Sequence, residues 1–120
     1  QESGSSRKQV IFTESAAALC HMPAMPKNSV SARQLTPLEM DTKAEPCIIE
    51  IAGGAALPSH FFIHKGEELG YVISGRLEMK LGATSSTART GDLIYLKSEM
   101  PSQWKNPGTS PARLLWIKIN

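Results

Sequence analysis

The sequence is poor in cysteine and contains no long apolar run. Its two cysteines, Cys20 and Cys47, are too few and too far apart for a disulfide scaffold or a four-thiolate zinc site, so we expect reduced side chains that pack in the interior. No apolar stretch approaches the roughly 18 residues of a membrane-spanning helix. These absences argue against the disulfide-rich and helical membrane classes and predict a cytoplasmic protein without a membrane partner.

An excess of charge of one sign is also missing. The chain has 13 basic and 11 acidic residues among 120, with a formal net charge of +2, and the basic residues are scattered along the sequence. A surface that holds phosphate groups needs basic side chains concentrated on one face. We therefore do not expect this domain to bind nucleic acid by itself. The length leaves room for one domain of ordinary size.

The beginning of the chain is typical of a piece of a longer polypeptide. The first residue is Gln1 rather than methionine, and the run QESGSSRK is small, polar and without apolar periodicity. We interpret residues 1–8 as a linker and residues 9–120 as a single domain. Two prolines make residues 20–28 irregular, and we expect this segment to cover the open end of a barrel.

Short strand-like runs follow one another at even spacing, separated by glycine, proline or polar clusters, with no long helical stripe between them. They cover residues 29–35, 47–51, 59–64, 69–74, 76–81, 84–90, 92–96, 102–105 and 113–119. Many short strands at this spacing are typical of an antiparallel sandwich or barrel. The physical prediction is an all-β jelly roll.

Side-chain parity predicts which residues face inward. If residues 59–64 are extended, His60, Phe62 and His64 leave the strand on one face. Adjacent Glu67 and Glu68 must point to opposite faces, so at most one carboxylate enters the barrel.

Two motifs then carry a family resemblance. The first consists of Gly54, His60, His64, Glu68 and Gly75, and the second of Gly91, Asp92, Pro101 and Asn106. In this order and spacing they resemble the two motifs of the cupin superfamily. The resemblance implies a cupin-type double-stranded β-helix, which is an antiparallel jelly-roll barrel, and it selects Glu68 as the inward carboxylate.

The amino-acid sequence around these motifs is similar to that of one branch of the superfamily. The runs HKGEELGYVISGRLEMKLG and GDLIYLKSEMPSQWKNPGTSPARLLWI resemble the ligand-sensing cupin domain of helix-turn-helix/cupin (Xre-type) transcriptional regulators. This resemblance implies a small-molecule effector, a homodimer, and DNA contacts made only by a helix-turn-helix domain upstream of Gln1.

The resemblance also implies a degenerate metal site. Metal-binding cupins hold a divalent ion such as Zn, Mn, Fe or Ni with three histidines and a carboxylate. His64 and Glu68 match two of these positions, whereas Phe62 and Ser102 occupy the other two. His60 could substitute for one missing ligand, giving the set His60, His64 and Glu68. We expect no cofactor, with this metal set as the alternative.

Without a metal, the same residues have two interpretations. His64 and Glu68 are either an ordered polar pair in the core or the polar end of a pocket for a small molecule. The pocket would be completed by Phe62, Ser102, Trp104 and His60. Trp104 shares parity with Ser102 and is a better candidate for the interior than Tyr71, whose parity is opposite to that of Glu68.

Three functions follow from these interpretations. The first is a ligand-sensing domain of a transcriptional regulator, with no catalytic residue. The second is a stand-alone metal-dependent cupin enzyme, of oxygenase or isomerase type, that uses His60, His64 and Glu68. The third is a structural dimerisation module whose barrel is filled.

Overall fold

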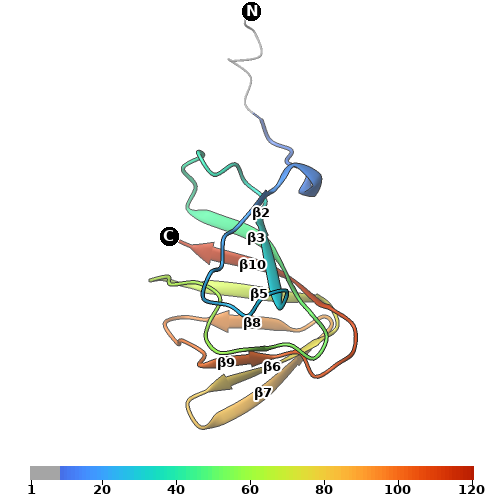
Figure 1. Cartoon of the computed structure of the whole chain (residues 1–120). Coiled ribbons are helices and arrows are strands. Elements are labelled where there is room, and N and C mark those ends of the chain that lie inside the picture. Colours follow the sequence, from blue (N-terminus) through green and yellow to red (C-terminus); the bar gives the residue numbers. More distant parts are fainter. Residues whose placement is uncertain (1–8) are drawn as a thin grey trace, which may run out of the picture.

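The computed structural model describes residues 9–120, so the linker predicted over residues 1–8 lies outside the described residues. One short 3-10 turn, η1 (Glu14–Ala16), precedes the strands. The strands are β1 (Ala18–Leu19), β2 (Val30–Gln34), β3 (Ala44–Ile51), β4 (Ala56–Leu57), β5 (Glu68–Ser74), β6 (Arg76–Leu81), β7 (Thr84–Arg89), β8 (Leu93–Leu96), β9 (Gln103–Lys105) and β10 (Ala112–Ile119) (Figure 1). None of the described residues forms a helix long and apolar enough to cross a membrane.

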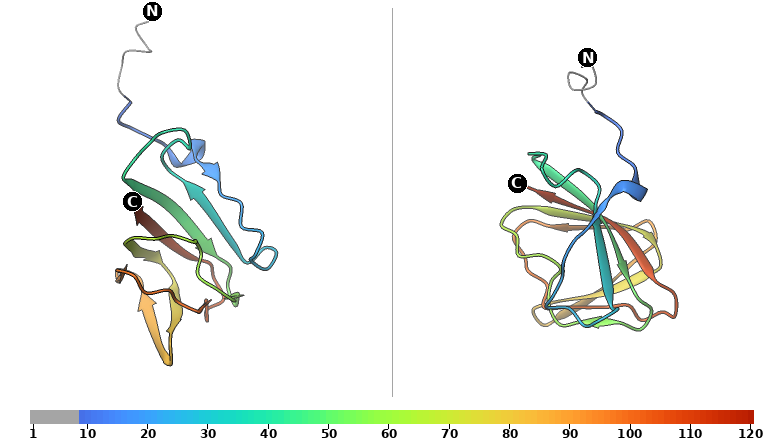
Figure 2. Two further views of the ribbon diagram at one scale, coloured as in Figure 1. Left: turned by 90° about the vertical axis from the view of Figure 1, so that its left-hand side faces the viewer. Right: turned by 45° about the horizontal axis from the view of Figure 1, so that its top comes forward.

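The strands form two antiparallel sheets packed as layers (Figure 2). The larger sheet has the order β1-β2-β3-β10-β5-β8, and the smaller has the order β4-β9-β6-β7. Every strand pair is antiparallel, and chain segments far apart in sequence, such as β3 and β10, lie side by side. The all-β jelly-roll prediction is confirmed.

Alternation along the strands decides what the core contains. In β10, Leu114 and Trp116 are fully buried, whereas their neighbours Leu115 and Ile117 are only partly covered. The inner face of β3 supplies Ile49 and Ile51 in the same way. The smaller sheet adds Leu57, Leu77 and Trp104 to the same buried cluster, so one core holds both sheets together.

The segment 59–64 is not a strand, contrary to the prediction. The chain leaves β4 after Leu57 and runs as an irregular loop until β5 begins at Glu68. In this loop the neighbours His60 and Phe61 are both buried, while Ile63 is fully exposed. An extended strand would send adjacent side chains to opposite faces, so only an irregular backbone can bury both.

Aromatic rings fill the space between the sheets. Phe61 stacks on Trp104 with ring centroids 4.6 Å apart and an interplanar angle of 18°. Trp116 meets Phe61 edge-on at 5.2 Å and Trp104 edge-on at 5.8 Å. Offset and edge-on contacts of this kind are the favourable arrangements for aromatic pairs. The barrel interior is therefore packed with side chains.

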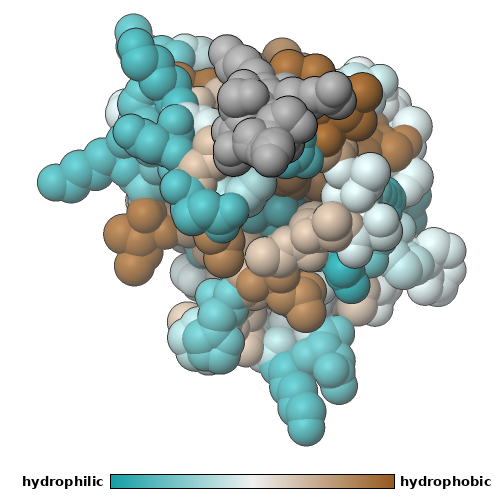
Figure 3. All heavy atoms as spheres, turned by 90° about the horizontal axis from the view of Figure 1, so that it is seen from above, coloured by the Kyte–Doolittle hydropathy of each residue, from teal (hydrophilic) through white to brown (hydrophobic). Residues whose placement is uncertain are grey.

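The surface carries hydrophobic side chains as well. Seen from above relative to Figure 1, both hydrophobic and hydrophilic residues lie at the surface (Figure 3). Tyr71, Leu93 and Tyr95 are among the large hydrophobic residues that are about half exposed or more.

Candidate functional site

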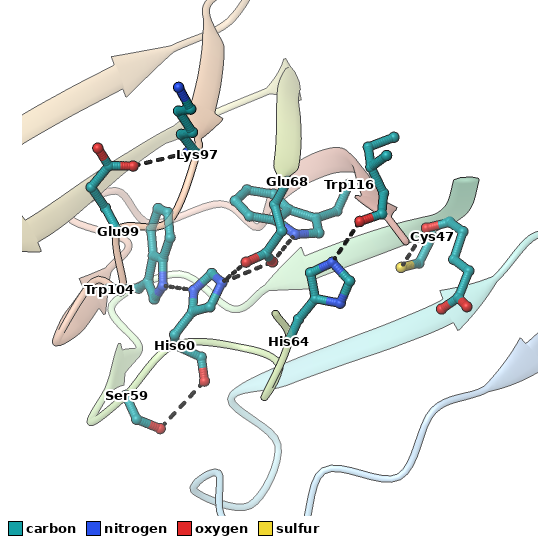
Figure 4. A network of polar contacts seen from close by, with 11 residues as sticks. Cys47, Ser59, His60, His64, Glu68, Lys97, Glu99, Trp104 and Trp116 are labelled. Atoms are coloured by element: carbon teal, nitrogen blue, oxygen red, sulfur yellow. Dashed lines mark hydrogen bonds and ion pairs between the residues drawn. The ribbon is translucent and has the colours of Figure 1, made fainter. Parts of the chain in front are cut away.

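A histidine and a carboxylate meet in the core. His60 comes from the loop after β4, and Glu68 is the first residue of β5. The His60 Nε2 atom lies 2.9 Å from Glu68 Oε1 and 3.0 Å from Oε2 (Figure 4). Only 6% of His60 and 2% of Glu68 is exposed. A buried ionisable pair of this kind is retained only when its hydrogen bonds are satisfied.

Two tryptophans complete the hydrogen bonding. The indole N–H of Trp104, on β9, donates to His60 Nδ1 at 3.2 Å, and that of Trp116, on β10, donates to Glu68 Oε1 at 2.8 Å (Figure 4). We call these four residues the His60–Glu68 network. An indole nitrogen can only donate, so Nδ1 of His60 must carry a lone pair and Nε2 must carry the proton. His60 is therefore a neutral imidazole that donates to Glu68.

The same hydrogen bonds determine the charge of Glu68. Burial raises the pKa of Glu68, but the hydrogen bonds donated by His60 and Trp116 act against burial, and the net shift is downward. The pKa consequently lies below its ordinary value of 4.5. At neutral pH the carboxylate is ionised and accepts two N–H donors in the interior.

A glycine makes room for one of these donors. Gly70 lies directly opposite Trp116 in the β5–β10 ladder. A Cβ atom at Gly70 would lie 2.2 Å from the Trp116 ring, which is far inside van der Waals contact. Sequence reasoning missed this role, although an isolated glycine inside a strand pattern is a known sign of close approach by a neighbour.

His64 and Phe62 lie outside the network, at the end of the barrel where β10 finishes. His64 Nε2 is 3.1 Å from the Ile119 carbonyl, to which it donates (Figure 4). The Lys118 ammonium lies 4.2 Å over the Phe62 ring and 3.3 Å from Glu45. The polar pair expected between His64 and Glu68 is thus made by His60 instead.

Of the other expected site residues, Trp104 and Glu68 are inside the barrel, whereas Ser102 is on the surface. Trp104 is inside the barrel and bonded to the network, as parity predicted. Ser102 is exposed, and its hydroxyl donates to the Lys80 carbonyl at 3.4 Å. Glu68 is buried while Glu67 is only partly covered, so the choice between the two carboxylates is confirmed.

The two cysteines are free thiols. Burial raises the pKa of Cys47 to about 12 and also raises the pKa of Cys20, so neither forms a reactive thiolate at neutral pH. The main-chain N–H of Cys20 donates to the Ala32 carbonyl on β2, so Cys20 lies beside one edge of β2. Cys47 is on β3, which pairs with the other edge of β2. Two strand spacings, roughly 9.5 Å, exceed the reach of a disulfide.

The residues present do not fit a metal ion as they are arranged. Among residues 9–120, no three histidine, cysteine, aspartate or glutamate side chains are grouped so that they could hold one. Both ring nitrogens of His60 are engaged by Trp104 and Glu68, and His64 is directed at a main-chain carbonyl. The set His60, His64 and Glu68 is therefore not assembled.

The fold and the packed interior define a small jelly-roll domain, and comparison with known families identifies it further. Residues 47–118 match the model of the Cupin domain family. This match spans more than half of the chain, and the chain belongs to the cupin family. A search of curated proteins found no match.

Solved structures share the fold with diverse proteins. The cupin domain of an XRE family transcriptional regulator from Enterobacter cloacae is 22% identical, with a TM-score of 0.65, covering 78% of this chain and 98% of that one. The polyketide cyclase RemF from Streptomyces resistomycificus is 16% identical, with a TM-score of 0.72 and coverages of 94% and 79%. A cupin barrel protein from Salinispora arenicola is 18% identical, with a TM-score of 0.67 and coverages of 95% and 89%. A regulator and an enzyme are both present, so the fold alone does not choose between these functions.

Proposed function

We propose that this cupin domain is the small-molecule-sensing domain of a transcriptional regulator. In this proposal it controls a helix-turn-helix DNA-binding domain that precedes Gln1 in the native polypeptide. The observation that carries the proposal is the closed His60–Glu68 network, because it leaves the interior without a free catalytic group. The sequence resemblance to helix-turn-helix/cupin regulators supports a regulatory function in particular, and the similar regulator domain from Enterobacter cloacae is compatible with this function.

The network favours a structural role for the barrel interior. A general base must reach its substrate with a free lone pair, and a metal ligand must direct a lone pair at the ion. His60 has neither, because Nδ1 accepts from Trp104 and the Nε2 proton is donated to Glu68. An enzyme that uses His60, His64 and Glu68 would have to break these bonds and also turn His64 away from Ile119. We therefore do not favour the metal-dependent enzyme.

The effector is proposed to bind at the end of the barrel where β10 finishes. Lys118 provides a donor there, the Nδ1 atom of His64 can accept a hydrogen bond, and Phe62 provides an apolar surface; all three are partly exposed. These groups suit a small metabolite that has hydrogen-bond acceptors and an apolar part. Such an effector regulates DNA binding only if it binds two conformations of the regulator unequally, typically by 1–3 kcal/mol.

The outer face of the larger sheet is proposed to hold a second copy of the chain. On β5 and β8, Tyr71, Ile73, Leu93 and Tyr95 are 46%, 39%, 61% and 50% exposed. Tyr71 and Leu93 are direct cross-strand partners, and Leu115 of β10 continues the row. We call these five residues the apolar face. Arg113 and Glu50 form an ion pair toward one end of the sheet, which matches the usual pattern of an uncharged interface centre with a charged rim.

The size of this surface agrees with a dimer. An aromatic side chain can bury about 150–250 Å², so two half-exposed tyrosines offer roughly 200 Å² and the whole apolar face on the order of 400–500 Å². A stable dimer buries about 800 Å² on each partner, of which somewhat more than half is apolar. The face therefore supplies the apolar share of one such interface, and a second copy presents the same surface.

A thermal-shift screen tests effector binding. We expect a metabolite to raise the melting temperature of the wild-type domain in a saturable way, because a ligand that binds only the folded state stabilises it. H64Q and K118Q should lose most of the shift. K65Q, which changes an exposed lysine in the same loop, should keep it. A shift that is equal in all four proteins, or no stabilising metabolite at all, contradicts effector binding at this end of the barrel.

A further inference from the structure

The outer face of the smaller sheet is basic. Along β6 the outward positions are Arg76, Glu78 and Lys80, and their cross-strand neighbours include Arg89 on β7 and Lys105 on β9. Four cations thus share this face with one carboxylate. In the sequence these residues are spread over thirty positions and give no sign of a cluster, but the strand order β9-β6-β7 gathers them.

Two of these cations face each other directly. Arg76 and Arg89 are Cα partners in the β6–β7 ladder, and both are exposed. Like charges at such positions are destabilising. Glu78, two residues along on the same face, has Lys105 and Thr87 as its direct cross-strand partners and forms no ion pair with either arginine. Within residues 9–120, the ion pairs of the protein involve neither arginine.

The arginine pair lies in a hollow of ≈ 420 Å³ between three turns. Arg76, Arg89, Thr90 and residues 108–110 are among its lining. The Thr90 hydroxyl donates to the Gly75 carbonyl and ties two of the turns together. The hollow is at the opposite end of β5 from Glu68, so it is separate from the proposed effector site.

The groups that line the hollow are mainly hydrogen-bond donors. Besides the two guanidinium groups, the hydroxyls of Thr109 and Ser110 make no hydrogen bond to another described side chain or carbonyl, and both residues are exposed. The Asp92 carboxylate, in the turn that follows Arg89, accepts a hydrogen bond from the main-chain N–H of Arg89 at 2.7 Å. A set of donors without an acceptor partner suits an anion with several oxygen atoms. Guanidinium groups match the geometry of phosphate particularly well.

We propose that this hollow binds the phosphoryl group of a small molecule, either inorganic phosphate or a phosphomonoester. The bound anion would lie between Arg76 and Arg89 and offset their mutual repulsion, while Thr109 and Ser110 donate to its remaining oxygens. The hollow is open to solvent, which suits a small charged group held by hydrogen bonds rather than an enclosed apolar ligand. Because Glu78 interrupts the basic residues toward Lys105, the face lacks the continuous cationic surface that a nucleic-acid backbone needs. This inference does not rest on the proposed regulatory function.

Titration with defined phosphates tests the proposal. Inorganic phosphate, glycerol 3-phosphate and a short DNA duplex are each added at constant ionic strength, and binding is followed by thermal shift and, for the small phosphates, by ³¹P NMR. We expect saturable binding of the two small phosphates, weakened at least about tenfold in R76Q and in R89Q. R33Q, which changes an exposed arginine on β2, should bind like the wild type.

A second readout separates binding from folding. Without phosphate, R89Q should be at least as stable as the wild type, because the substitution removes one of two opposed like charges. A phosphate response that is the same in R76Q, R89Q and R33Q overturns the proposal. So does a result in which the DNA duplex binds through these arginines while both small phosphates fail to bind.

Discussion

At the scale of single residues, the position of one proton organises the interior. Trp104 donates to His60 Nδ1, so His60 is neutral and donates from Nε2 to the Glu68 carboxylate, which also accepts from Trp116. Each polar side-chain atom of the four residues in the network has a hydrogen-bond partner. A satisfied network of this kind favours one arrangement of the core, since loss of any member leaves a buried group without a partner.

The lowered pKa of Glu68 predicts how stability depends on pH. A group whose pKa is lower in the folded state than its ordinary value of 4.5 stabilises the fold above that value, and the contribution is lost as pH falls through the folded pKa. We therefore expect the free energy of unfolding to fall below about pH 4.5. In E68Q this acid-dependent loss should be smaller, and stability at neutral pH should be lower.

Urea denaturation at several pH values measures both effects. Glu45 and Glu99 also have lowered pKa values, so the difference between wild type and E68Q is the informative quantity. E39Q, which alters an exposed glutamate, serves as the control. Equal acid dependence in wild type and E68Q would show that Glu68 is not ionised and bonded as described.

The sequence predicted part of this arrangement. Motif spacing and parity correctly selected Glu68 over Glu67 and placed Trp104 inside. The predicted histidine partner of Glu68 was wrong: His64 was chosen by its match to the cupin motif, whereas the irregular loop turns His60 toward Glu68 and His64 toward the Ile119 carbonyl. The role of Trp116 was not foreseen either, since nothing in the local sequence shows that β10 lies beside β5.

At the scale of elements, β10 and the loop before β5 position the network. β10 lies between β3 and β5 and brings Trp116 over Gly70, while the irregular loop lets both His60 and Phe61 enter the core. The strands β6 and β8 were predicted almost to the residue because glycine turns flank β6 at both ends and precede β8. The loop was mistaken for a strand because tertiary burial of two adjacent aromatic residues leaves no periodic signal in the sequence.

Adding one methyl group to β5 tests the contact between these strands. In G70A the new Cβ would collide with the Trp116 ring, and neither strand can move without disturbing its ladder. Overpacking of this kind costs typically about 1–3 kcal/mol, which denaturant unfolding can measure.

The matching control is the same substitution in a W116F background. Phenylalanine removes part of the indole at the collision point, so the additional cost of G70A should shrink. A G70A domain as stable as the wild type would contradict the close approach of β5 and β10.

At the scale of the whole molecule, the two sheets present different outer faces. The larger sheet carries the apolar face, whereas the smaller sheet carries four cations and one carboxylate. The sequence could predict two sheets but not this division. Which strand lies beside which is set by long-range pairing, for example of β8 with β5 and of β9 with β6. The proposed dimer and the proposed phosphate site both follow from that pairing.

Charge placed on the apolar face should separate the proposed dimer. We expect light scattering after size exclusion to give the mass of two chains for the wild type and of one chain for the double variant Y71K/L93K. Lysines at these exposed positions would be forced against their own symmetry copies, and burial of unpaired charge is costly. Q103K, on the outer face of the smaller sheet, should remain dimeric. A wild-type protein that is monomeric at high concentration contradicts this interface.

The central claim is that this cupin domain serves a regulator, and the mass of the native polypeptide tests it most directly. Intact mass spectrometry of the protein from its source cells, read together with the coding frame upstream of Gln1, should give a mass several kilodaltons above 13.0 kDa. The additional sequence should contain a helix-turn-helix pattern. A native mass close to 13.0 kDa would contradict the account, because no DNA-binding domain would then be attached for the cupin domain to control.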